Sequence, residues 1–284
     1  MNSETPAAVP ASVPAPSSDP TAATYKSNPF HPAISVLGST LKMNGIALLQ
    51  ISALITAVIL AAYFATLAGL ILPGLSPEYG FFFILPILAV VAFAYWGSRL
   101  LAALIRLWGA SSDGTEMTWR EAYADTNKYV LKLVGLILLM ALILIPAYFL
   151  FVIPGLYLTG RLGLAVSALV SENLSVIAAL KRSWALSKGH VVEILGAQYA
   201  STLLGTNGLV GLNYVPSSSY GRYRQLAALP EDATEKPKVH WLNWLFVVVI
   251  PILTTLFLTF YLATIVNSIN NMQNQAPTTT SEDL

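Results

Sequence analysis

The chain has 284 residues, of which 55% are hydrophobic and 10% charged, with a mean hydropathy of +0.65 and a formal net charge of +1. Soluble domains carry about 25% charged residues, so this composition excludes an ordinary soluble domain, and the near-neutral charge gives no general attraction to nucleic acid. The chain has no cysteine, which excludes disulfides, thiolate metal sites and cysteine nucleophiles.

The chain divides by composition into a tail, a membrane domain and a second tail. Residues 1–32 are rich in Pro, Ala, Ser and Thr, and we expect a disordered cytoplasmic tail because they cannot bury enough apolar surface. Residues 33–269 form the expected membrane domain, and residues 270–284 a polar tail. Six apolar stretches in the domain are long enough to cross a bilayer as helices, which takes about 20 residues. They lie at 45–72, 80–106, 130–152, 156–171, 190–212 and 241–266.

The fold class follows from these stretches. Backbone groups in lipid must be bonded within the protein, so the spans are helices or a closed barrel. A barrel would show alternating strands of about ten residues, whereas these runs are continuous and rich in Leu, Ala and Ile. We therefore predict an all-α polytopic membrane bundle of about six transmembrane helices. Stretch 190–212 is the least apolar, so a five-span alternative would omit it.

Three short amphipathic segments, at 35–50, 119–135 and 176–196, each feed directly into a span and a hairpin. In the second, Thr118 and Glu121 have the spacing of a capping box. The pattern predicts three helical hairpins, each preceded by a cytoplasmic surface helix. Such a helix either senses lipid or docks a partner, or it only sets the angle of the next span. The third segment is expected to place apolar side chains on one face and cations toward the other: Val176, Ile177, Leu180 and Trp184, against Lys181, Arg182 and Lys188.

The distribution of lysine and arginine predicts the orientation. Connections 107–132 and 172–190 are basic, while the turns at 73–79 and 153–155 contain neither residue. Cytoplasmic loops carry the excess of these residues, so we expect both connections and both termini to face the cytoplasm. The expected partners are the lipid bilayer and anionic headgroups at that face, with no nucleic acid. Segment 213–240 is then an extracytoplasmic loop, although its four cations disagree with the rule.

Charges inside or near the spans are candidate functional residues, because intramembrane charges usually face the bundle interior or a wet cavity. Arg99 can extend toward the inner surface or pair with Glu172 or Glu193. For Arg161 we expect a clamp, in which its guanidinium donates to backbone carbonyls freed near Pro146 or Pro154.

Stretch 196–211 combines small residues with uncharged polar residues. Close helix packing explains this mixture, and the alternative is the wall of a hydrophilic path. Catalytic motifs are absent from the sequence. His31, His190 and His240 fall in unrelated segments, and there is no nucleophile elbow, Walker loop or dinucleotide fingerprint, so we expect no enzymatic site, cofactor or metal.

The remaining candidates lie in residues 153–190, which begin with a Pro-Gly turn and end with a Lys-Gly turn. Its motif residues are Pro154, Gly155, Leu156, Tyr157, Leu158, Arg161, Glu172, Ala179, Leu180, Lys181, Arg182, Ser183, Trp184, Lys188 and Gly189. With them the block resembles the YciC-like bacterial inner-membrane proteins and is similar to the membrane domain attached to some glycerophosphoryl diester phosphodiesterases. The resemblance implies a six-helix protein of the bacterial plasma (inner) membrane. It does not imply phosphodiesterase activity, since that activity belongs to a separate soluble domain.

Together these features favour a non-enzymatic integral membrane protein with a structural, scaffold or membrane-homeostasis role. One alternative is a small transporter or channel subunit with a polar path along residues 196–211. Another is a membrane module that partners a lipid-headgroup enzyme such as a glycerophosphodiester phosphodiesterase. The sequence identifies no protein partner.

Overall fold

The computed structural model describes residues 27–75, 81–150, 152–204, 213–229 and 239–275. Every regular element in these ranges is a helix. Five helical stretches within them are long and apolar enough to cross a membrane: His31–Leu72, Phe81–Ser112, Asn127–Leu150, Ile153–Ser171 and Trp241–Ser268. The all-α membrane class predicted from the sequence is therefore confirmed, with five candidate spans in the described residues.

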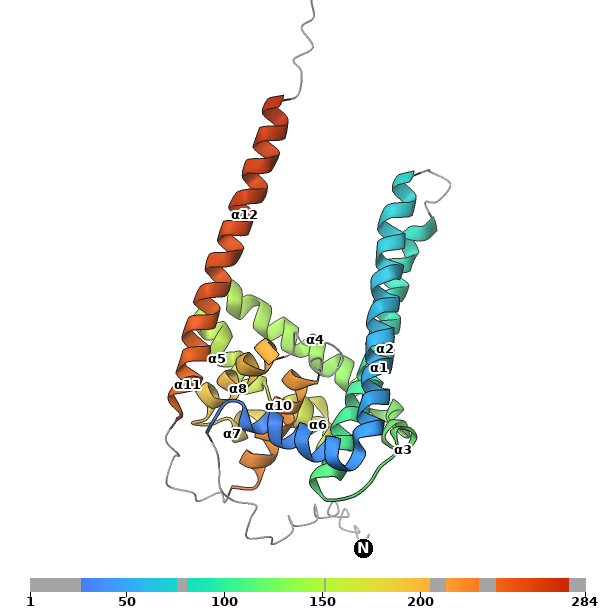
Figure 1. The fold of residues 1–284 in the computed structure, drawn as a ribbon, viewed down its shortest axis with the longest axis vertical. Helices are drawn as coiled ribbons and strands as arrows, with labels where there is room; N and C mark the ends of the chain where they lie inside the picture. Colours follow the sequence, from blue (N-terminus) through green and yellow to red (C-terminus); the bar gives the residue numbers. More distant parts are fainter. Residues whose placement is uncertain (1–26, 76–80, 151, 205–212, 230–238, 276–284) are drawn as a thin grey trace, which may run out of the picture.

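The helices form a base from which two arms rise on the same side (Figure 1). One arm is the pair α1 (His31–Leu75) and α2 (Ile84–Ser112), and the other is α12 (Ile250–Gln275), which follows α11 (Trp241–Trp244) and the π-helix η3 (Leu245–Val249). Helix α4 (Asn127–Leu150) runs obliquely across the base and turns into α5 (Val152–Leu162). The base also contains α3 (Trp119–Tyr123), α6 (Ala165–Ser171), α7 (Val176–Leu186), α8 (Val191–Leu204) and α10 (Tyr214–Ala227).

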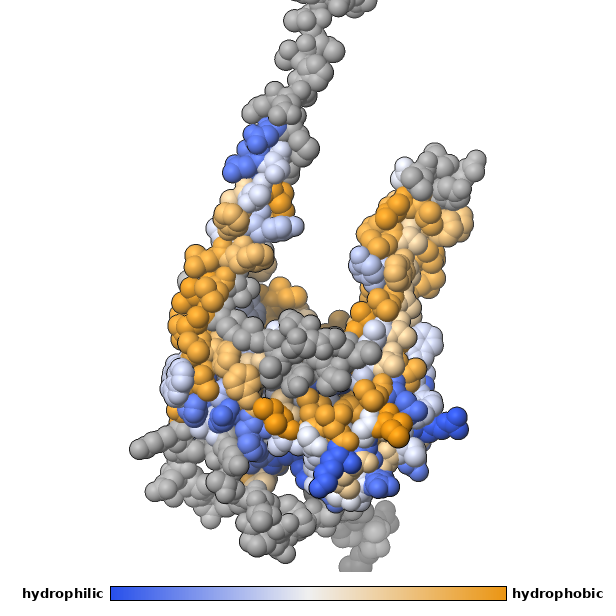
Figure 2. Space-filling model, viewed as in Figure 1, coloured by the Kyte–Doolittle hydropathy of each residue, from blue (hydrophilic) through white to orange (hydrophobic). Residues whose placement is uncertain are grey.

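The buried core lies in the base, where side chains from the lower parts of α1, α2, α4 and α6 meet. Leu48, Trp108, Leu133 and Leu169 are fully buried there. Above the base the arms present apolar side chains outward on most of their surface, as the orange surface in Figure 2 shows. Apolar surface of this extent requires lipid or another apolar partner around it, as expected of membrane spans.

Helix α1 bends at Asn44, whose φ of −127° and ψ of 32° are not helical. The Asn44 side-chain amide donates to Ser111 Oγ at 2.8 Å and to the Thr115 carbonyl at 3.1 Å, and its oxygen accepts from the Met117 amide at 2.7 Å. These bonds tie the bend to the connection after α2. The bend separates residues 31–43 from the long apolar stretch, so a short segment feeds into the first span as predicted.

The second amphipathic segment begins with the predicted capping box. The Glu121 amide donates to Thr118 Oγ1 at 3.3 Å, and the Thr118 amide donates to Glu121 Oε2 at 2.8 Å. These hydrogen bonds to Thr118 lower the pKa of the Glu121 carboxyl. Helix α3 therefore starts where the sequence predicted and leads through a short turn into α4.

The least apolar of the predicted spans, 190–212, corresponds in part to α8. This helix has 14 residues, so it is about 21 Å long, which is less than the roughly 30 Å of a bilayer core. Residues 205–212 lie outside the described residues. Residues 1–26 of the predicted N-terminal tail and residues 276–284 of the predicted polar tail also lie outside the described residues. Residues 270–275 of that second tail continue α12.

The described part of segment 213–240 differs from the expected extracytoplasmic loop. Residues 214–227 form α10, which packs in the base. Arg224 pairs with Asp113 at 2.8 Å, and the Tyr223 hydroxyl donates to Glu172 at 2.8 Å. Because Asp113 and Glu172 belong to the two basic connections, α10 lies on their side of the molecule. The membrane side of this segment stays a prediction, since residues 205–212 of the expected fifth span lie outside the described residues.

The two ends of the described chain lie far apart. The Asn243 side chain donates to the Ser27 carbonyl at 2.6 Å, so the start of α1 and the start of the last span are together in the base. Helix α12 then leads away, and Gln275 lies at the far end of its arm (Figure 1). The start of α1 and the end of α12 thus lie at opposite ends of the described structure, and the expectation that both termini face the cytoplasm stays a prediction.

Candidate functional site

Charged side chains gather in the base. The arms above it, at residues 45–75, 81–98 and 250–275, contain no lysine or arginine. Figure 2 shows the same separation, with hydrophilic surface around the lower end of the molecule and apolar surface on both arms. The uncharged polar residues at the far end of α12 form a second hydrophilic zone. The base is therefore the part of the described chain that can bind a charged ligand or surface.

The Pro-Gly turn begins α5 and closes its hairpin with α4. Pro154 and Gly155 lie in the first turn of α5. A Cβ at Gly155 would stand 2.5 Å from the ring of Tyr148, so this ring needs the glycine. The Tyr148 hydroxyl also shares a hydrogen bond of 2.8 Å with Thr159 Oγ1. These two residues of the candidate set thus serve the packing of α4 on α5.

Arg161 lies in the last turn of α5 and faces α7. It is only 6% exposed, and its guanidinium carbon lies 4.1 Å from the ring centre of Trp184 and 5.9 Å from that of Tyr157. Its backbone carbonyl accepts from Ser183 Oγ at 2.8 Å and from Ser187 Oγ at 3.1 Å. The end of α5 is therefore fixed to α7 through the main chain, while the side chain packs against aromatic rings.

The predicted clamp of Arg161 on freed carbonyls is wrong. Within the described residues its side chain donates no hydrogen bond, and its buried Nε has no partner. The prediction placed Arg161 near the outer surface, at the level of the breaks at Pro146 and Pro154. In the structure α5 descends from that turn toward α7, so Arg161 lies beside Trp184 in the base.

Glu172 links three helices. It caps the C-terminus of α6, and its Oε1 accepts from Arg182 Nε of α7 at 2.9 Å and from the Tyr223 hydroxyl of α10 at 2.8 Å. Burial, and then the hydrogen bond to Glu172, raise the pKa of the Tyr223 phenol above its ordinary value. The phenol therefore keeps its proton and acts as the donor. Sequence reasoning singled out Glu172 and Arg182 but not Tyr223.

The exposed face of α7 differs from the predicted one. Its inner side is centred on small residues, of which Ala179, Ser183 and Ser187 are fully buried. The partly buried Val176, Leu180 and Leu186 pack against the core beside them. Its outer side carries two apolar and two cationic side chains, all exposed, at helical spacing: Ile177, Lys181, Trp184 and Lys188. Ile177 and Trp184 are thus exposed beside the two lysines and not on a separate apolar face. Tryptophan rings and long lysine side chains are common where a helix meets a membrane interface.

The Lys-Gly turn connects α7 to α8. Gly189 has a φ of +87°, a conformation that glycine adopts without strain, so the turn can be tight. The next residue, His190, shares a hydrogen bond of 2.7 Å between its Nδ1 and Oε2 of Glu193, whose side chain is fully buried. Glu193 thus belongs to the start of α8.

Arg99 pairs with neither of the expected carboxylates. Its Nε donates to Thr126 Oγ1 at 3.2 Å, and its guanidinium carbon lies 4.0 Å from the ring centre of Tyr123. The connection after α2 folds back along that helix and supplies these contacts. Glu172 and Glu193 are engaged elsewhere, so the structure does not connect Arg99 with the cluster at α5 and α7.

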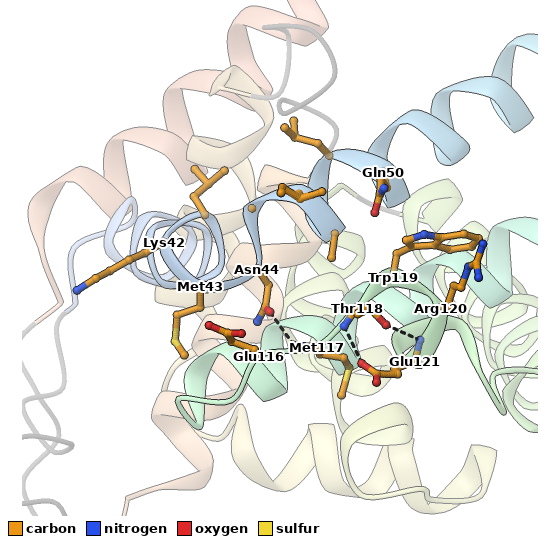
Figure 3. A pocket seen from close by; sticks show the side chains of 15 residues that line it. Lys42, Met43, Asn44, Gln50, Glu116, Met117, Thr118, Trp119, Arg120 and Glu121 are labelled. Atoms are coloured by element: carbon orange, nitrogen blue, oxygen red, sulfur yellow. Dashed lines mark hydrogen bonds between the residues drawn. The ribbon is translucent and has the colours of Figure 1, made fainter.

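A groove of about 1070 Å³ lies between the bend of α1 and α3. Figure 3 shows Asn44 at its back and the Trp119 and Arg120 side chains at one end. Its charged lining residues are Lys42, Glu116, Arg120 and Glu121, and the apolar part comes mainly from Leu41, Ile46 and Leu49 of α1. Sequence reasoning missed the groove, because it depends on the bend at Asn44.

The fold and the site together define an all-helical protein of the membrane class, in which the described residues form a cationic base and two apolar arms rise from one side of it. In the described ranges no group of three or more histidine, aspartate or glutamate residues could hold a metal. Comparison with protein families, with characterised proteins and with solved structures finds no match. The resemblance of residues 153–190 to the YciC-like family therefore stays a prediction.

Proposed function

We propose that the chain is a non-enzymatic integral membrane protein with a structural or scaffold role, whose base lies among the headgroups of the cytoplasmic leaflet. The outer face of α7 carries this proposal. Trp184 and Ile177 can insert between headgroups, while Lys181 and Lys188 lie beside them and attract anionic lipid. Each lysine near an anionic surface contributes about 1 kcal/mol.

The distribution of cations supports an orientation with the base on the cytoplasmic side of a bacterial plasma membrane. The turns at 73–79 and 153–155 and the segment 270–284 contain no lysine or arginine, whereas the described cations lie in the base. With α10 in the base, Arg222 and Arg224 no longer conflict with the positive-inside rule. We infer five spans, as two hairpins and the single helix α12, with the start of α1 cytoplasmic and the end of α12 outside.

Polar residues of α8 favour packing over a transport path. Gln198 donates to Ser219 Oγ of α10 at 3.2 Å, and Thr202 donates to the Gln198 carbonyl at 2.9 Å. Gly196 lies against Asn243 of α11, where a Cβ would collide with its side chain and backbone. These contacts use polar and small residues to hold helices together, which supports the structural role. A partnership with a lipid-headgroup enzyme stays a prediction.

The experiment compares unfolding midpoints of the full chain in nanodiscs of phosphatidylcholine alone and of phosphatidylcholine mixed with phosphatidylglycerol. We expect the anionic lipid to raise the midpoint, and added salt to remove this gain, because the attraction is electrostatic. Lys181→Gln with Lys188→Gln should lose the gain, and the matched pair Lys181→Arg with Lys188→Arg should keep it. A wild-type midpoint that is equal in both lipids would contradict the proposal.

A further inference from the structure

We infer that Arg161, with Trp184 and Tyr157, forms a binding site for a phosphate group, supplied by the headgroup of a membrane phospholipid. The inference rests on the proposed function in one respect, that the base lies at headgroup level. It adds a specific site to the general attraction of the α7 surface. The argument depends on the missing counter-charge of Arg161, on the arrangement of the two rings and on access from the surface.

Arg161 is a nearly buried cation without an anion. It forms no ion pair, and its guanidinium donates no hydrogen bond to any residue of the described ranges. The nearby acids are committed, since Glu172 binds Arg182 and Tyr223, and Glu193 binds His190. A buried charge is costly without a partner, so a bound anion would stabilise this arrangement.

The rings leave the hydrogen-bond donors of Arg161 available. Trp184 packs on the guanidinium, and the Trp184 and Tyr157 rings stand nearly perpendicular to each other, at 88° and 6.5 Å between centres. Stacking occupies the flat side of a guanidinium and does not consume its N–H groups, which lie in its plane. Phosphate oxygens accept two such N–H groups in parallel, which makes phosphate a better match than a single-point acceptor.

The site opens toward lipid. Trp184 is 43% exposed and Tyr157 48% exposed, so both rings reach the surface while Arg161 stays below it. Ile153 on α5 and Ile177 on α7 are exposed on the same two helices and offer apolar surface to acyl chains. A free phosphate would use the same donors but would gain nothing from this apolar surface.

The groove of Figure 3 is larger but a weaker candidate for a phosphate. Its cations, Lys42 and Arg120, are matched in number by Glu116 and Glu121. All four side chains are exposed, so none of them requires a ligand to offset burial. Arg161 is the stronger site because its charge is buried and its donors have no acceptor in the described chain.

The test uses the delipidated full chain in detergent, titrated with phosphatidylcholine or with monogalactosyldiacylglycerol, with binding followed by native mass spectrometry. Both lipids are uncharged overall, and only the first has a phosphate, so attraction by Lys181 and Lys188 does not separate them. We expect wild type to bind phosphatidylcholine about tenfold more tightly than monogalactosyldiacylglycerol, which is the difference that one charge-assisted interaction makes. Arg161→Gln should abolish this preference, and the exposed control Lys42→Gln should keep it.

Arg161→Lys keeps the positive charge but lacks the paired N–H donors of the planar guanidinium, so we expect a reduced preference for phosphatidylcholine. This variant replaces Arg161→Gln in the test if Arg161→Gln does not fold. Displacement of phosphatidylcholine by inorganic phosphate would support the site with free phosphate as its ligand, and failure to displace it would support the lipid. Equal binding of the two lipids to wild type, or an unchanged preference in Arg161→Gln and Arg161→Lys, would overturn the inference. Neither result depends on phosphatidylglycerol, whose effect tests the proposed function separately.

Discussion

At the scale of single residues, Glu172 holds more of the base together than any other candidate carboxylate, because one oxygen binds side chains from α7 and α10. Glu172→Ala leaves the Tyr223 hydroxyl and the Arg182 guanidinium without their acceptor. We expect a loss of about 1–3 kcal/mol in the free energy of unfolding, toward the lower end because Arg182 is partly exposed. Denaturant titration in detergent measures this loss.

Asp113→Asn is the matched control. It removes the other carboxylate that pairs with an arginine, but both Asp113 and Arg224 are exposed. We expect a change of less than about 1 kcal/mol, since exposed ion pairs contribute little. Equal losses in Glu172→Ala and Asp113→Asn would show that the link through Tyr223 adds nothing.

The contacts of single residues were predictable where a local sequence rule applied. They were not predictable where the partner depends on how the helices pack. The capping box of Thr118 and Glu121 follows from spacing alone, and the sequence predicted it. The partner of Arg161 depends on where α5 ends relative to α7, and no local pattern encodes that. Tyr223 could not be linked with Glu172 either, since 51 residues separate them.

At the scale of helices, α10 depends on a close approach to the start of α1. A Cβ at Gly221 would collide with the carbonyl of Pro32, which is backbone and cannot rotate away. Gly221→Ala should therefore separate α10 from α1 and lower the unfolding midpoint, at a cost of about 1–3 kcal/mol as for overpacking. The measurement is a thermal unfolding curve in detergent.

Gly38→Ala in α1 is the control for that substitution. No atom lies within 4 Å of a Cβ added at Gly38, so alanine fits there. We expect no loss, and a gain of up to about 1 kcal/mol, because alanine favours a helix over glycine. If Gly221→Ala is as stable as Gly38→Ala, α10 does not pack against α1 as described.

The apolar spans were predictable because their signal is long and continuous, as in α2 and α4. Helix α10 was not, because its polar residues, among them Ser217, Ser218 and Arg222, indicate a loop when taken alone. They are buried in the base, and Arg222 donates to Gln225 at 3.0 Å and to the Asn28 carbonyl at 3.3 Å. Because α10 buries polar side chains that form hydrogen bonds, its sequence lacks the regular spacing of apolar residues by which a buried helix is recognised.

At the scale of the whole molecule, the central claim is that every described lysine and arginine lies in the base. The α1–α2 hairpin leaves the base and returns to it, whereas α12 leads out of the base and ends at the far end of its arm. The chain has no cysteine, so single cysteines report the side of each segment without a background. Three exposed positions mark the parts concerned: Lys188 after α7, Ala228 after α10 and Asn271 near the end of α12.

The most direct test is labelling of Lys188→Cys, Ala228→Cys and Asn271→Cys with a membrane-impermeant maleimide in intact cells and in permeabilised cells. We expect Asn271→Cys to react in intact cells, because the proposed arrangement has α12 cross the bilayer and end outside. Lys188→Cys and Ala228→Cys should react only after permeabilisation, because the proposal puts the base on the cytoplasmic side. Reaction of Ala228→Cys in intact cells, or protection of Asn271→Cys together with Lys188→Cys, would contradict the five-span arrangement.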